Sequence, residues 1–127
     1  MREIRFRAYE PDDKIMLDIK SIEFENEFVT IKTDEYEEYD GKADEFHIMQ
    51  YTGLKDKHGV CIYEGDIVKN SLKDMLEVIW NEDRCCFEMR GRYSNSHVSR
   101  SLDCDIVIDL SIEVVGNIYE NKGLLDD

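Results

Sequence analysis

Alternation of hydrophobic and polar residues marks the start of the chain. From Glu3 to Tyr9 every second residue is hydrophobic, and the same period of two returns from Ile15 to Lys20. A period of two is typical of a β-strand with one buried face. The residues between, "EPDDK", hold the single proline, Pro11, together with aspartates that favour turns. The pattern therefore predicts an N-terminal β-hairpin.

The pattern is less regular in the next segment. Ile22–Lys32 fits neither the helical nor the strand period, although its end, Phe28–Lys32, has the composition of a strand. Lys32–Glu45 follows with seven carboxylates and only Tyr36 and Tyr39 as large side chains with an apolar body. Such a segment buries too little surface to order itself, so we predict a loop.

Two turn signals lie close together in "YTGLKDKHGVCIYEGDIVKN", Tyr51 to Asn70. Lys55–Gly59 predicts the tip of a hairpin, because Gly59 can adopt a positive φ. Glu64 and Gly65, between β-forming residues, predict a sharp corner between successive strands. We expect the chain to turn twice here and to stay in one sheet.

Further hydrophobic runs continue the β pattern toward the C-terminus. Met75–Trp80 and Cys85–Arg90 flank "NEDR" as another predicted hairpin. Its expected core members are Val78, Trp80 and Phe87. Ile106–Leu110 and Ile112–Val115 supply the last predicted strands. Short strands without sustained helical periodicity predict a mainly β protein with little helix, either a small barrel or a pair of curled sheets.

Three separated blocks carry a resemblance to a known family. "MQYTGLKDKHGVCIYEGDIVK", "IEVVGNIYEN" and the opening "MREIRFRAYE" are similar to the YopX family of phage and prophage proteins. The resemblance implies a phage or prophage setting, and that family has no established catalytic residues to carry over. The motif positions that we interpret as structural are Gly53, Gly59, Glu64, Gly65, Asp66 and Gly116.

The chain is interpreted as one YopX-like domain over residues 1–127. An N-terminal β region is expected over about residues 1–45 and a barrel-like region over about 46–127. The C-terminal half also resembles SH3-like barrels, in which a Gly-Asp corner opens a strand such as "DIVK".

Composition adds a strong acidic balance. The 127 residues include 42% hydrophobic and 36% charged residues, and the formal net charge is −14. That charge disfavours nucleic-acid binding over the whole surface. No stretch approaches the roughly 18 apolar residues of a membrane span, and "MREIRFRAYE" is too charged for a signal peptide. We therefore expect a cytoplasmic protein in a bacterial host cell that does not bind membranes.

Side chains capable of chemistry form no recognisable catalytic or metal-binding pattern. Glu64 and Asp66 could pair for acid–base work or a divalent cation, but strand corners commonly carry such residues. The candidate zinc ligands, which lack CxxC spacing, are His47, Cys61, His58, Cys85, Cys86, His97 and Cys104. Adjacent Cys85 and Cys86 should point to opposite faces of a strand, and the thiols are expected to be reduced. We predict no catalytic residues, metal or cofactor.

A basic segment runs against the global charge. From Arg84 to Arg100 four arginines face one acidic residue, Glu88, and Gly91–Ser101 is interpreted as a loop. The candidate binding residues are Arg84, Arg90, Arg92, Tyr93, His97 and Arg100. Arginines with an interleaved tyrosine can hold phosphate and stack on a base. Alternatively, the arginines pair with the protein's own carboxylates, within the chain or across a subunit interface.

The leading hypothesis is a non-enzymatic accessory protein that binds another protein, from host or phage, or a copy of itself. It would use sheet edges and the two oppositely charged segments, Lys32–Glu45 and Gly91–Ser101, and would be a homo-oligomer. One alternative is a small nucleic-acid-binding barrel that uses the arginines. A second is an enzyme of unknown class.

Overall fold

The fold of the described residues is mainly β, as the sequence predicts. The computed structural model describes residues 1–25, 28–33, 37–93 and 96–125, with the backbone alone for residues 28, 37, 92–93 and 96–98. All strand pairs are antiparallel and belong to two sheets. Antiparallel strands can be joined by short turns, which suits this turn-rich chain.

The first sheet contains the predicted N-terminal hairpin. Its strands are β1 (Phe6–Glu10), β2 (Ile15–Glu25), β3 (Phe28–Thr33), β4 (Gly41–Lys42), β5 (His47–Lys55) and β6 (Cys61–Tyr63). Their order is β4-β3-β2-β1-β5-β6. Ala8 pairs with Leu17 across the hairpin, and both side chains are buried. The predictions of this hairpin and of a strand at Phe28–Lys32 are confirmed.

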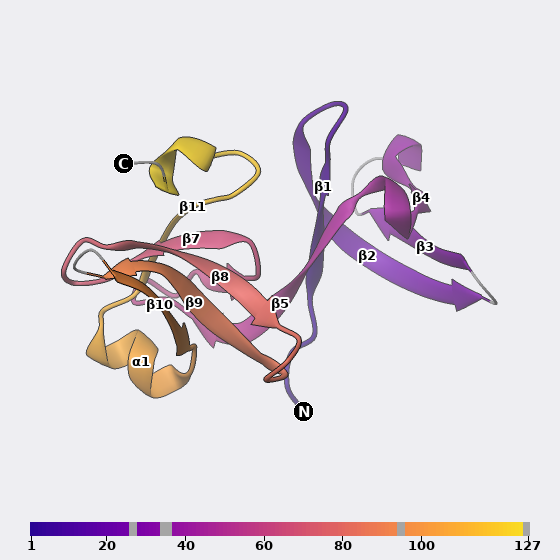
Figure 1. Cartoon of the computed structure of the whole chain (residues 1–127). Helices are drawn as coiled ribbons and strands as arrows, with labels where there is room; N and C mark the ends of the chain where they lie inside the picture. Colours follow the sequence, from indigo (N-terminus) through magenta and orange to yellow (C-terminus); the bar gives the residue numbers. More distant parts are fainter. Residues whose placement is uncertain (26–27, 34–36, 94–95, 126–127) are drawn as a thin grey trace. The chain divides into compact units, whose positions relative to one another are not determined.

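The second sheet is built from the C-terminal strands (Figure 1). They are β7 (Asp66–Lys69), β8 (Met75–Asn81), β9 (Cys86–Tyr93), β10 (Ser96–Ser101) and β11 (Glu113–Asn117). Their order is β10-β9-β8-β7-β11, so β10 and β11 are the two edge strands of this sheet. Within the described residues neither sheet closes into a barrel, and the SH3-like barrel of the C-terminal half is not confirmed.

The chain forms two compact units, Glu3–Gln50 and Tyr51–Asp127, and β5 continues from one into the other. Buried hydrophobic residues of the first unit are Ala8, Tyr9, Leu17, Ile31 and Met49. The hydrophobic cluster of the second unit is Ile62, Val68, Leu76, Val78, Met89, Leu102, Val107 and Ile112. These residues come from β6, β7, β8, β9, helix α1 (Cys104–Asp109) and the segments that flank α1.

The corner at Glu64 and Gly65 is present, but its consequence differs from the prediction. Gly65 has a φ of 86°, which a residue with a side chain rarely adopts. Strand β6 before the corner pairs with β5, whereas β7 after it pairs with β8 and β11. The chain therefore changes sheets at Gly65, and the prediction that it stays in one sheet is wrong.

A short helix replaces one predicted strand. Residues Cys104–Asp109 form α1, so the strand predicted at Ile106–Leu110 is wrong. Asp103 is its N-cap, and its side chain accepts a hydrogen bond from the backbone N–H of Ile106 at 2.9 Å. An aspartate cap favours a helix start more strongly than a β-rich composition favours a strand.

The acidic segment contains short ordered elements rather than a plain loop. They are η1 (Glu37–Tyr39), β4 and η2 (Ala43–Glu45), while residues 34–36 lie outside the described residues. Asp40 Oδ1 accepts a hydrogen bond from Thr33 N–H at 2.8 Å, and Tyr39 Oη donates to Asp13 Oδ2 at 2.8 Å. That bond to Asp13 raises the pKa of Tyr39 to about 12. These hydrogen bonds hold Tyr39 and Asp40 of this segment to β3 and to the turn after β1.

Trp80 is not a core residue. Its side chain is 44% exposed and packs edge-on against Phe87, with ring centroids 4.9 Å apart. Val78, two residues earlier on β8, is fully buried as predicted. The strand period places Trp80 on the same face of β8 as Val78, but the hydrophobic core does not extend to the last residues of β8. The prediction that Trp80 is buried is therefore wrong.

Candidate binding surface

The predicted basic loop is part of a β-hairpin. Most of Gly91–Ser101 lies in β9 and β10, so its interpretation as a loop is wrong. The side chains of Arg92, Tyr93 and His97, three of the candidate binding residues, lie outside the described residues. The alternation that marks a strand is hidden here because serine, glycine and asparagine dominate the segment.

Arg84 forms an ion pair with a buried carboxylate. Its Nη1 lies 3.2 Å from Oε2 of Glu88, whose side chain is 1% exposed. Asn81 Nδ2 donates to the other oxygen, Oε1, at 2.8 Å. Asn81 ends β8 and Arg84 lies in the turn that follows, so the end of the hairpin closes over a carboxylate that is costly to bury without hydrogen-bond donors.

Arg90 is also paired within the chain. Its Nη2 lies 3.5 Å from Oε1 of Glu77, its direct neighbour across the β8–β9 ladder. Arg100 is exposed on β10 and has an interaction partner as well. Two of the six candidate binding residues therefore match the alternative in which the arginines neutralise the protein's own carboxylates.

Strand β10 forms one end of the second sheet and pairs only with β9 among the described strands. Leu102 N–H donates to Phe87 O at 2.9 Å, just beyond the register pair Ser101 and Glu88. Hydrogen-bonded and non-hydrogen-bonded pairs alternate along an antiparallel ladder. The backbone N–H groups of Ser99 and Ser101 therefore point away from β9, toward the outer edge.

The opposite end of this sheet is covered. At β11 the backbone N–H of Val114 donates to Asp56 Oδ2 at 2.9 Å, and Asn117 N–H donates to Asn121 Oδ1 at 3.1 Å. These side chains accept hydrogen bonds from backbone N–H groups that an incoming strand would need as donors. The two edges of the sheet thus differ in the side chains that bond their backbone N–H groups.

Asp56, in the family-like motif, holds the hairpin tip to β11. Its Oδ1 accepts hydrogen bonds from the backbone of His58 at 2.8 Å and Val60 at 2.9 Å. Desolvation raises the pKa of Asp56, but the N–H donors, led by Val114, outweigh it, so the pKa lies below its ordinary value. The carboxylate is a structural element of the turn.

Glu113 is a polar residue that sequence reasoning did not single out. Its carboxylate lies 3.7 Å from Lys57 Nζ, 3.5 Å from His58 Nε2 and 3.8 Å from Lys69 Nζ. These residues come from two of the blocks that resemble the YopX family. Because the three basic groups share one carboxylate on a partly exposed surface, the cluster connects the two blocks and presents no reactive group.

The remaining motif residues also have structural surroundings. Asp66 is 1% exposed, and its Oδ2 accepts a hydrogen bond from Tyr63 N–H at 2.8 Å, across the corner. Gly53 and Gly59 have φ values of 88° and 82°. A Cβ on Gly116 would lie 2.6 Å from Asn121 Oδ1. The motif therefore builds turns and close backbone contacts.

A cluster of metal ligands is not found in the described part of the chain. No three His, Cys, Asp or Glu side chains there are placed to share a metal ion. The four cysteines are unbonded. No described helix has the length and apolar character needed to cross a membrane.

Each unit contains a hollow among its described residues. An acidic hollow of about 580 Å³ in the first unit is lined by six carboxylates with Tyr39 and Phe46. A more apolar hollow of about 330 Å³ in the second unit lies between β5 and α1. Neither hollow brings together an acid, a base and a nucleophile, so neither has the composition of a catalytic pocket.

These observations define a small antiparallel β protein in which β10, among the described strands, pairs on one side only. A family model described as YopX protein matches residues 5–126, and the chain belongs to the YopX family. It is similar to the crystal structure of protein EF1440 from Enterococcus faecalis, with 23% sequence identity and a TM-score of 0.54. That similarity covers 99% of this chain and 100% of the other and concerns the fold. No curated protein matches the chain.

Proposed function

We propose that this protein is a non-enzymatic binding module that pairs the outer edge of β10 with an extended segment of a partner protein. The observation that carries the proposal is the position of β10 at the end of the second sheet, with β9 as its neighbour in the described chain. Added strands bind through backbone hydrogen bonds, which need regular geometry but no particular side chains.

The contrast between the two sheet edges supports this proposal. Natural proteins protect edges that must not pair, as Asp56 and Asn121 do along β11. On β10, the outward backbone groups of Ser99 and Ser101 carry small side chains that leave room for a neighbouring strand. The partner can therefore approach the backbone closely.

The charge pattern gives less support to nucleic acid as the ligand. Arg84 and Arg90 are held by Glu88 and Glu77. Releasing either arginine toward phosphate would leave a carboxylate without its partner, which opposes binding. Family membership adds a phage or prophage setting, in which the partner is a host or phage protein.

Replacing Ser99 with proline tests the edge. Proline removes the outward N–H of residue 99 and places a ring on the edge, while the hydrogen bonds to β9 come from neighbouring residues. We expect Ser99→Pro to weaken partner binding by roughly tenfold or more, the equivalent of at least one lost hydrogen bond. Ser99→Ala is the matched control, because it keeps the N–H and should bind like wild type.

The measurement is affinity capture from host cells with and without phage genes, followed by a binding titration with each protein that is recovered. The proposal requires a partner held by wild type and Ser99→Ala and lost by Ser99→Pro, with similar melting temperatures for all three. Equal binding by the three variants would overturn it. Capture of nucleic acid that weakens as salt rises would support the nucleic-acid alternative instead.

A further inference from the structure

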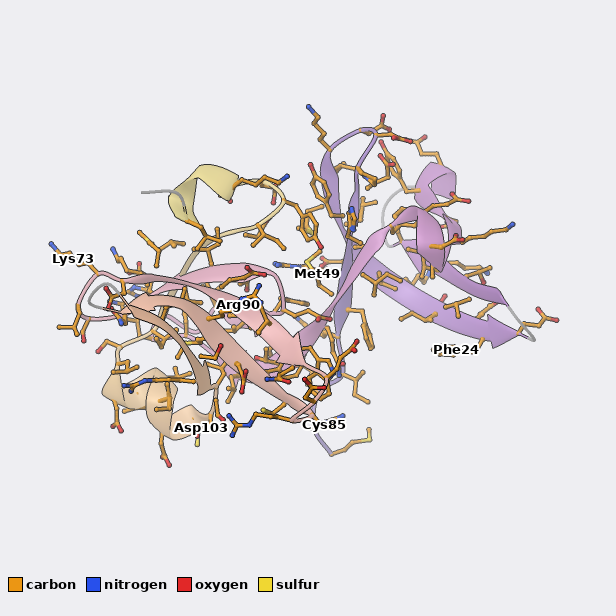
Figure 2. The ribbon with its side chains drawn as sticks, in the orientation of Figure 1. Phe24, Met49, Lys73, Cys85, Arg90 and Asp103 are labelled. Carbon is orange, nitrogen blue, oxygen red and sulfur yellow. The ribbon has the colours of Figure 1, made fainter. Side chains whose placement is uncertain are left out.

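Two adjacent cysteines lie where β8 turns into β9. Cys85 is the last residue of the turn and is exposed, and Cys86 is the first residue of β9 and is partly exposed. Figure 2 shows Cys85 at the end of the second sheet, opposite the end that carries Lys73. Two adjacent cysteines, one exposed and one partly exposed, therefore lie at one end of the second sheet.

The backbone at this tip departs from strand geometry. Cys85 has a φ of 54°, in the left-handed region. The rule that adjacent side chains point to opposite faces applies within a strand, and Cys85 precedes the strand. The expectation of opposite strand faces therefore does not apply to Cys85, which is exposed, while Cys86 is partly exposed rather than buried.

The turn between β8 and β9 is stabilised mainly by hydrogen bonds that do not involve the two sulfur atoms. Asn81 Oδ1 accepts hydrogen bonds from the backbone of Asp83 at 3.0 Å and Arg84 at 3.1 Å. The sulfur contacts are weak: Cys85 Sγ lies 3.5 Å from Glu82 O, and Cys86 Sγ lies 3.8 Å from Glu88 Oε2. The thiols can exchange these contacts for a ligand while the turn persists.

The spacing of the two residues favours one kind of ligand. Neighbouring Cα atoms are about 3.8 Å apart, which is shorter than the usual separation of about 4.4–6.8 Å in a disulfide. A direct disulfide here would be strained and easily reduced. A single atom that binds both sulfurs lengthens the bridge and removes that strain.

We propose that Cys85 and Cys86 form a vicinal dithiol site for a monosubstituted trivalent arsenical or a chemically equivalent thiophilic centre. A trivalent arsenical keeps one carbon substituent and binds two sulfur atoms, so it needs only the two protein ligands that this turn supplies. A structural zinc ion needs four ligands, and no group of three candidate ligands exists among the described residues.

The binding step requires no oxidant or reductant. The arsenic–oxygen bond of an organic arsenoxide is replaced by two arsenic–sulfur bonds. The two thiol protons leave with the oxygen as one water molecule, and arsenic remains trivalent throughout. Chelation by linked thiols has an effective concentration of about millimolar or higher, so the complex should resist ordinary monothiols.

Phenylarsine oxide tests the site on the full-length protein. We expect one phenylarsenic group per chain by intact mass, with loss of two titratable thiols. The adduct should persist in about 1 mM glutathione, because a monothiol must displace two linked sulfurs. A small dithiol such as dithiothreitol should remove it. Full release by that glutathione concentration would contradict chelation.

Cysteine variants identify the ligands. Cys85→Ser and Cys86→Ser should each lose the glutathione-resistant adduct, whereas the double variant Cys61→Ser and Cys104→Ser should keep it. Cys85 is exposed, so its serine variant keeps the test valid even if replacement of Cys86 disturbs β9; circular dichroism checks the fold of each. Retention of the adduct by Cys85→Ser, or its loss from the double variant, would overturn the proposal.

Discussion

Single polar residues in this protein are explained by the backbone groups they satisfy. Asp56 accepts three backbone N–H donors, and Asp66 accepts one across the corner. A buried N–H without a partner costs about 1–3 kcal/mol, so side chains that accept from several donors are difficult to replace. The presence of these two aspartates in the motif is thus explained by the backbone hydrogen bonds that they accept in the folded chain.

Replacing Asp56 with asparagine should destabilise the second unit by about 2 kcal/mol at neutral pH. The amide nitrogen would face N–H donors that now bind a carboxylate oxygen. Asp18→Asn is the matched control, because Asp18 is exposed on β2 and should change stability by less than about 0.5 kcal/mol. Urea unfolding followed by circular dichroism measures both.

The effect of Asp56→Asn should depend on pH. The native pKa of Asp56 lies below its ordinary value of 3.8, so on acidification the unfolded chain binds the proton first. The stability that the carboxylate contributes is therefore present above pH 3.8 and declines as the pH falls through the native pKa. A difference between wild type and variant that stays constant down to pH 2 would contradict this account.

Gly65 and Gly41 differ in the conformation that they require. Gly65 has a φ of 86°, and its N–H and C=O bond Val78 and Ile118. Valine there should cost more than about 2 kcal/mol. Gly41 lies in β4, where a Cβ meets the flexible Glu45 carboxylate at 3.3 Å, so Gly41→Val should cost less than about 1 kcal/mol. Equal denaturation midpoints would refute this contrast.

At the scale of elements, the β8–β9 hairpin combines a hydrophobic face with an ion pair between the buried Glu88 and the exposed Arg84. Val78 and Met89 are fully buried and opposite each other. Glu88, next to Met89, is also buried, and its carboxylate accepts hydrogen bonds from Asn81 at the end of β8 and from Arg84 in the turn. The side chains at this end of the hairpin therefore supply the donors that a buried carboxylate needs.

Arg84→Ser should destabilise the hairpin more than Arg90→Ser. Glu88 is 1% exposed, so losing Arg84 leaves a buried carboxylate short of one partner, at a cost of about 1–3 kcal/mol. Glu77 is 21% exposed and Arg90 57%, so their pair should contribute less than about 1 kcal/mol. Thermal unfolding compares the two, and adding Glu88→Gln to Arg84→Ser should recover part of the loss. Equal losses for the two serine variants would mean that burial of Glu88 is unimportant.

At the scale of the whole molecule, open edges favour association while the net charge of −14 opposes it. Two β10 strands could pair antiparallel about a two-fold axis, since such pairing is self-complementary. Repulsion between like-charged copies is screened by salt. Self-association through this edge should therefore increase with ionic strength.

We expect the protein to be larger than its chain mass of 15.0 kDa at tens of micromolar concentration in moderate salt. Ser99→Pro should lower the mass toward that of the monomer, and Ser99→Ala should leave it unchanged, because only proline removes the outward N–H. Light scattering coupled to size-exclusion chromatography measures all three. A mass of 15.0 kDa for wild type at every salt concentration would exclude the oligomer.

Local patterns in the sequence were sufficient for much of the fold. The β1–β2 hairpin follows from alternation around Pro11, and the turns at Gly59 and Gly65 follow from glycine between β-forming residues. Two of the three blocks that resemble the YopX family lie wholly within the matched residues 5–126, and the opening block lies within them from residue 5 onward. These features depend on a few neighbouring residues, so their signal is contained in short windows.

Only the tertiary structure decided which elements meet. The change of sheet at Gly65, the exposure of Trp80 and the paired arginines depend on where other strands lie. The bond from Val114 to Asp56 joins residues 58 positions apart. The helix at Cys104–Asp109 has a local cap at Asp103, yet its β-rich composition concealed it. A local pattern determines turns and strand faces, whereas burial and pairing are set by contacts between distant segments, which no short window contains.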